Sequence, residues 1–93
     1  MFYIVEYNII NMKIDALNLK KRLIRTTLPK GWKLNSINSK EFKVTCPFED
    51  RFEVDSNVYD ENVERIETMT DSKCTGGGYF IGSDIYDIYF AFN

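Results

Sequence analysis

The amino-acid sequence predicts one α+β domain over residues 1–93, with an antiparallel sheet of about five to six strands and one or two helices packed on one face. The first reason is size and composition: 93 residues, 44% hydrophobic and 15% aromatic, suffice for one small core. The second is the apolar pattern, in which one helical segment is surrounded by short segments with the two-residue period of strands. The third is the aromatic-rich stretch 76–93, which predicts a β-hairpin.

The first third of the sequence predicts a strand followed by a helix. Residues 2–10 have two largely apolar faces, which is typical of a strand inside a sheet. Residues 13–28 have helical periodicity, and Pro29 and Gly31 follow as residues that end a helix. Its predicted polar side holds Asn18, Lys21, Arg22 and Arg25. Its predicted apolar side holds Ile14, Ala16, Leu17, Leu19, Leu23, Ile24 and Leu28.

The middle of the sequence predicts an antiparallel meander of three strands, over residues 32–37, 41–46 and 51–55. The second of these strands alternates most cleanly and is stopped by Pro47. The residues predicted to face inward from the second and third strands are Phe42, Val44, Cys46, Phe52 and Val54.

Residues 56–70 favour a second helix, because Tyr59, Val63 and Ile66 recur at helical spacing. A strand over residues 63–69 is the alternative. In either case the acidic residues of this segment are expected to face solvent.

The C-terminal part predicts a loop over residues 71–78 and then a hairpin of two strands, 79–81 and 85–92, around the turn Gly82-Ser83-Asp84. The other face of the last strand, with Ile85, Asp87 and Tyr89, is apolar enough that we expect a helix or a partner to cover it. A second copy of the chain is one such partner, so a homodimer is possible. The core face of the last strand is predicted to hold Tyr86, Ile88, Phe90 and Phe92.

Several kinds of chemistry lack their residues in this sequence. There is no His, and the only cysteines are Cys46 and Cys74, so a Cys/His metal cluster cannot form and a thiolate nucleophile has no His base. The run Gly76–Gly78 lacks the spacing of a phosphate-binding loop. We therefore expect no catalytic residues, no metal and no cofactor. The start lacks a signal peptide and no apolar run is long enough for a bilayer, so we expect a cytoplasmic protein without a membrane partner.

The charge is distributed unevenly along the chain. Residues 1–48 hold nine basic and three acidic residues, a net charge of +6, whereas residues 49–93 hold three basic and eleven acidic residues, a net charge of −8. Such an asymmetry predicts either two surfaces of opposite potential or two halves that pair with each other inside the fold.

The leading hypothesis is a small non-catalytic binding protein that inhibits its partner by occlusion. Its acidic half would cover a basic surface, such as the nucleic-acid-binding surface of a host protein or nucleoprotein complex. The abundance of Ile, Asn, Lys and Tyr is typical of AT-rich coding sequences, which points to a phage or mobile-element product of the anti-defence or anti-CRISPR kind. The predicted partner-binding acids are Glu53, Asp55, Asp60, Glu61, Glu64, Glu67, Asp71 and Asp87.

The alternative is a nucleic-acid-binding module on the basic helix and the segment that follows it. Lys and Arg side chains would contact phosphates, and Trp32 would stack on a base. The residues of this alternative site are Lys21, Arg22, Arg25, Lys30, Trp32 and Lys33. An enzyme is a third hypothesis, which requires carboxylates with shifted pKa values in a closed pocket.

Overall fold

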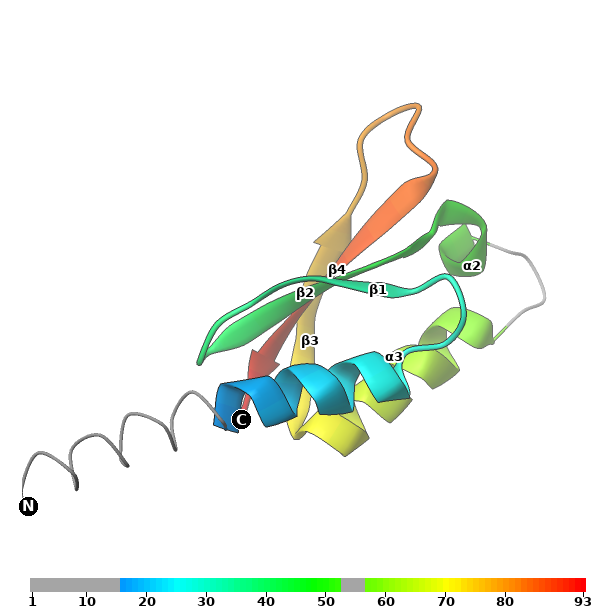
Figure 1. The fold of residues 1–93 in the computed structure, drawn as a ribbon. Coiled ribbons are helices and arrows are strands. Elements are labelled where there is room, and N and C mark those ends of the chain that lie inside the picture. The colour runs from blue at the N-terminus through cyan, green and yellow to red at the C-terminus, as the bar shows by residue number, and fades with distance from the viewer. Residues whose placement is uncertain (1–15, 53–56) are drawn as a thin grey trace, which may run out of the picture.

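The structure is a computed structural model that describes residues 16–52 and 57–93 (Figure 1). The predicted strand over residues 2–10 and the acids Glu53 and Asp55 lie outside these described residues. Residues 16–27 are helical, inside the helix predicted over 13–28. The other elements are β1 (Lys33–Ile37), β2 (Glu41–Pro47), α2 (Phe48–Phe52), α3 (Val58–Thr70), β3 (Ser72–Gly78) and β4 (Ile85–Phe92).

The described strands form one antiparallel sheet in the order β1-β2-β4-β3, which confirms the predicted α+β class. β4 is central, because it pairs with β2 on one side and with β3 on the other. The helix over residues 16–27 and α3 lie against one face of the sheet, where Ile24 and Ile66 join one core cluster (Figure 1). No described element covers the opposite face, which we call the open face.

The core lies between the sheet and the two longer helices. β2 and β4 alternate as predicted, and their register pairs Phe42 with Phe90 and Val44 with Ile88. The rings of Phe42 and Phe90 stack at a centroid distance of 4.8 Å. Burying a large apolar side chain contributes about 1.5–3 kcal/mol, so these pairs dominate the stability of the domain. The buried hydrophobic residues are Ile24, Trp32, Phe42, Val44, Cys46, Ile66, Tyr86, Ile88 and Phe90.

The sheet has four strands in the described residues, fewer than the five to six predicted. The prediction of a strand over 51–55 is wrong for residues 51 and 52, which belong to α2. Phe48 and Phe52 are four residues apart, and a helix brings their rings within 4.5 Å of each other. Residues 79–81 are not a strand either, because they belong to the connection between β3 and β4.

The prediction of a loop over residues 71–78 is also wrong, because Ser72–Gly78 is the edge strand β3. Gly77 is needed where β3 meets the core. A Cβ on Gly77 would lie 2.6 Å from Oη of Tyr86 and 2.7 Å from the carbonyl oxygen of Asp87. The ring of Tyr86 therefore packs directly over the backbone of Gly77.

The helix over residues 16–27 buries a narrower face than its sequence predicts. Ile24 is fully buried and Leu28 packs against the core, but Leu19 is 60% exposed and Leu23 38% exposed. The helical prediction for residues 56–70 is confirmed by α3, which buries Ile66. No helix in the described ranges 16–52 and 57–93 has the length and hydropathy of a membrane span.

We predict that Gly77→Ala lowers the free energy of unfolding by about 1–3 kcal/mol, because the added methyl group overpacks the contact with Tyr86. Gly78→Ala is the matched control, since its Cβ would meet nothing within 4 Å. Urea denaturation of both variants measures the difference. Equal stabilities would contradict the packing of Tyr86 over Gly77.

Candidate interaction surface

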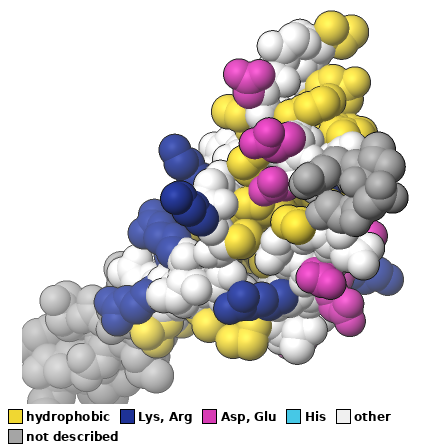
Figure 2. Space-filling view, turned by 90° about the vertical axis from the view of Figure 1, so that its right-hand side faces the viewer, with side chains coloured by type: hydrophobic (Ala, Val, Ile, Leu, Met, Phe, Trp, Pro, Cys, Tyr) yellow, Lys and Arg dark blue, Asp and Glu magenta, His cyan; other side chains and the backbone are white. Residues whose placement is uncertain are grey.

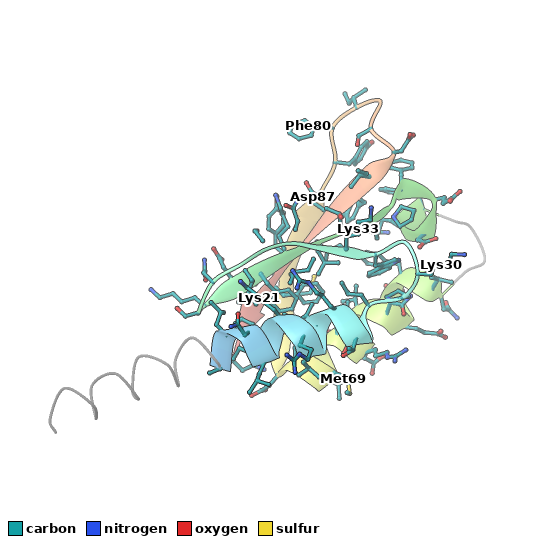
Figure 3. The ribbon with its side chains drawn as sticks, viewed as in Figure 1. Lys21, Lys30, Lys33, Met69, Phe80 and Asp87 are labelled. Carbon is teal, nitrogen blue, oxygen red and sulfur yellow. The ribbon has the colours of Figure 1, made fainter. Side chains whose placement is uncertain are left out.

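The two most exposed large apolar side chains of the described residues lie at the end of the β3–β4 hairpin, which projects beyond the rest of the molecule (Figures 1 and 2). Phe80 is 81% exposed and Ile81 is 98% exposed. Figure 3 shows Phe80 pointing away from the sheet. Contiguous exposed apolar side chains of this kind mark interaction sites in soluble proteins. We call the following five residues the hairpin tip: Phe52, Tyr79, Phe80, Ile81 and Ile85.

Backbone hydrogen bonds shape the turn of the tip. The amide of Ser83 donates a hydrogen bond of 2.9 Å to the carbonyl of Phe80, which closes a turn with Ile81 at its first central position. Gly82 occupies the second central position with φ of +84°, which glycine adopts without strain. The amide of Phe48 donates to the carbonyl of Asp84 at 2.8 Å, so the hairpin is also bonded to the start of α2.

A cluster of aromatic rings supports the tip from below. Tyr79 lies 5.0 Å from Phe48, 5.7 Å from Phe52 and 6.5 Å from Tyr86, measured between ring centroids. Tyr86 in turn lies 5.9 Å from Tyr59 of α3 in an edge-on arrangement. Each such aromatic pair contributes about 0.5–1.5 kcal/mol of stability beyond the burial of its rings. These pairs therefore connect the tip to both α2 and α3.

Arg51 lies inside this aromatic cluster. Its guanidinium carbon is 4.5 Å from the centroid of Tyr59 and 5.4 Å from that of Tyr86. A hydrogen bond with Tyr86 is the main cause that raises the pKa of Arg51 above its ordinary value. The charge of Arg51 is therefore used in cation–π packing within the domain.

Acidic side chains surround the base of the tip. Glu49 and Asp50 lie beside Phe48 and Phe52 in one depression, and Glu49 and Asp84 share a second. Figure 2 shows acidic side chains close to the hydrophobic end of the hairpin. The tip is thus an apolar protrusion with a negatively charged base.

The acids predicted from the sequence do not share one surface. Asp60, Glu61 and Glu64 are exposed on α3, which covers the helical face of the sheet. Asp87 alternates with the buried residues of β4 and lies on the open face, so the sheet separates it from α3.

Two further predicted acids have structural roles. Oε2 of Glu67 accepts a hydrogen bond of 2.8 Å from the backbone amide of Cys74 in the edge strand β3. Asp71 ends α3 in the left-handed conformation, and its Oδ1 accepts a bond of 2.9 Å from Nδ2 of Asn93. These carboxylates stabilise the fold locally.

The basic residues of the alternative site are only partly brought together. Lys21, Arg22 and Arg25 line one shallow depression on the helix over residues 16–27, and Lys30 and Lys33 are exposed further along the chain (Figure 3). The prediction that Trp32 stacks on a base is wrong. The side chain of Trp32 is only 5% exposed, and its Nε1 donates a 2.8 Å hydrogen bond to Oδ2 of Asp50. Its ring therefore cannot stack on a base.

The two cysteines are free and cannot pair with each other in this fold. Cys46 pairs with Tyr86 and Cys74 with Phe90, on opposite sides of β4. They are separated by two strand spacings of about 4.8 Å each and by four residues along β4. This exceeds the Cα separation of about 4.4–6.8 Å that a disulfide requires.

Burial shifts two ionisable groups near the aromatic cluster. It raises the pKa of Cys46 from 9.0 to about 12, with a further contribution from the charge of Asp50. Burial likewise raises the pKa of Tyr59 from 10.0 to about 12. Cys46 therefore remains a neutral thiol at physiological pH and is a poor nucleophile.

We predict that Glu67→Ala lowers the free energy of unfolding by about 1–3 kcal/mol, because the Cys74 amide loses its acceptor. The change also leaves the backbone N–H of Cys74 on the edge strand β3 without an acceptor. Size-exclusion chromatography should therefore show more self-association. Glu67→Gln keeps a side-chain oxygen and should restore most of the stability. Glu64→Ala, on the exposed side of α3, is the control, and an equal effect of both alanine variants would rule out this role of Glu67.

We also predict that stability decreases between about pH 9 and pH 12. The unfolded chain releases the protons of Cys46 and Tyr59 at lower pH than the folded chain, so their contribution is complete below pH 9 and is lost as pH rises toward 12. The double variant Cys46→Ala/Tyr59→Phe should lose less stability over this range in urea titrations. An identical slope for the variant and the wild type would contradict the assignment.

The hairpin tip does not follow from the predicted strand over residues 79–81. The signal for it in the sequence is Gly82, the turn glycine that comes directly after Phe80 and Ile81. Within the described part of the chain, no group of three or more His, Cys, Asp or Glu side chains could hold a metal ion. No protein-family model, curated protein or solved structure matches this sequence.

Proposed function

We propose that this protein is a non-catalytic binding protein that inserts its hairpin tip into an apolar pocket of a protein partner. The observation that carries the proposal is the exposure of Phe80 and Ile81, at 81% and 98%, on a turn that is closed by its own hydrogen bond. The backbone of an apolar side chain on a hydrogen-bonded turn is already ordered before binding. Burial of this side chain by a partner therefore costs little backbone entropy.

The tip has the composition of an interface hot spot. Aromatic and large apolar anchors that enter a pocket provide most of the binding energy in protein complexes, and polar residues around them exclude water. Phe80 and Ile81 are such anchors, and Tyr79 and Phe52 extend the apolar surface toward α2.

The acidic base of the tip selects the kind of pocket. Glu49 and Asp84 flank the tip, so a partner with Lys or Arg around its pocket is attracted at long range and binds faster. The same charge disfavours an anionic membrane surface. A host protein whose nucleic-acid-binding groove combines aromatic side chains with Lys and Arg offers both features, and occupation of the groove would inhibit it. The contact surface is then the tip, with the acids of α3 in a secondary role.

We predict that Phe80→Ser/Ile81→Ser abolishes partner binding and leaves the fold unchanged, because both side chains are almost fully exposed. A photo-crosslinking residue at position 80 in the native host should yield one dominant adduct, to be identified by mass spectrometry. The same residue at position 68 on α3 is the control. Binding of the purified adduct partner to the wild type and to the double variant then measures the effect.

The electrostatic part of the proposal has its own variant. Glu49→Lys/Asp84→Lys should slow association with the same partner and reverse its dependence on salt. Glu61→Lys/Glu64→Lys on α3 should have a smaller effect. If the α3 variant abolishes binding and the double serine variant does not, the helix is the contact surface and the proposal for the tip fails.

A further inference from the structure

The open face of the sheet carries an ordered arrangement of polar and aromatic side chains. The register places Lys33, Thr45 and Asp87 in one row across β1, β2 and β4. The next row holds Ser36, Lys43 and Tyr89. A third row holds Glu41, Ala91 and Lys73. Figure 3 shows Lys33 and Asp87 of the first row.

Tyr89 is the exposed ring of this face. It lies on the central strand β4 and is 44% exposed, and Nζ of Lys43 is 5.8 Å from its centroid. Beside it is a small hollow of about 170 Å³ that Tyr89 and Lys43 line together with the β1–β2 hairpin. A typical drug-sized ligand needs roughly 300–1,000 Å³, so this hollow has room for little more than one planar ring. The lining residues from the hairpin are Ser36, Ile37, Asn38, Glu41 and Phe42.

On the side that faces β3, the backbone carbonyl of Tyr89 accepts a hydrogen bond of 3.3 Å from Oγ1 of Thr75. The partner of Tyr89 in the register is Gly76, and a Cβ built on Gly76 would meet nothing within 4 Å. Gly78, which pairs with Asp87, is equally open. A flat aromatic group can therefore lie beside Tyr89 over Gly76 and Gly78, where β3 has no side chain.

The charges around Tyr89 suit a strand of alternating bases and phosphates. Lys33, Lys43 and Lys73 come from three different strands, and Lys40 follows in the β1–β2 turn, so cations lie on both sides of the ring. The carboxylates of Glu41 and Asp87 lie one row away from Tyr89 along the strands, where they can accept hydrogen bonds from base amino groups. An aromatic platform with flanking lysines is the chemistry that binds single-stranded nucleic acid.

From this arrangement we infer that the open face is a binding site for single-stranded nucleic acid, with Tyr89 as the stacking residue and Lys43 as its closest phosphate contact. The site is separate from the hairpin tip and does not depend on the proposed protein partner. It also differs from the basic helix, because the helix over residues 16–27 lies on the other face of the sheet.

Fluorescence anisotropy with end-labelled oligo(dT) and oligo(U) of about 12 nucleotides tests the inference at low salt. We expect the full chain to bind at least one of the two and to lose affinity as salt increases. Tyr89→Ala should weaken binding on the order of tenfold. Tyr79→Ala is the matched control, a tyrosine of similar exposure at the tip (49% against 44%), and should leave the affinity unchanged. Thermal melts confirm that both variants are folded.

The proposed phosphate contact of Lys43 is tested separately, by the dependence of affinity on salt. Lys43→Gln should lower the slope of log affinity against log salt by about one, as expected for the loss of one phosphate contact. The inference is overturned if neither oligonucleotide binds, or if Tyr89→Ala and Tyr79→Ala bind equally well. It is also overturned if Lys21→Gln/Arg22→Gln/Arg25→Gln on the helix abolishes binding while Tyr89→Ala does not.

Discussion

The packing of Tyr86 over the backbone of Gly77 is the contact on which the rest of the structure depends. Because position 77 has no side chain, the ring reaches across β3 and meets Tyr79, Tyr59 and Phe52. Tyr86 of the central strand β4 thereby contacts the edge strand β3, the projecting hairpin, α2 and α3. Arg51 then fills the remaining space above these rings as a cation.

The two oppositely charged halves of the sequence are interleaved in the fold. β2 comes from the basic half and β4 from the acidic half, and the two strands pair along their whole length. Lys33 and Asp87 consequently lie in one row, with Thr45 between them. Within residues 16–52 and 57–93, basic and acidic side chains therefore share the open face, and exposed aromatic side chains mark both this face and the tip.

The sequence predicts those parts of the fold in which side-chain burial is periodic. β2 and β4 show strict alternation, and α3 shows helical spacing, so their type and their core residues could be predicted. β3 could not, because an edge strand rich in glycine is formed by backbone pairing and by contacts with residues distant in sequence. α2 could not be predicted either, because Phe48 and Phe52 fit a helix while Phe52 and Val54 fit a strand equally well. The lysines beside Trp32 predict a binding site, but Asp50, the hydrogen-bond partner of Trp32, is 18 residues away in the sequence.

The hydrogen bonds of Asn93 join the end of β4 to the end of α3. Its amide and side chain bond to Asp71 at the end of α3, whereas the turn lies beyond the opposite end of β4. Eight residues of extended strand separate the two ends by about 27 Å. A label on the side chain at position 93 therefore lies at the end of β4 remote from the hairpin tip.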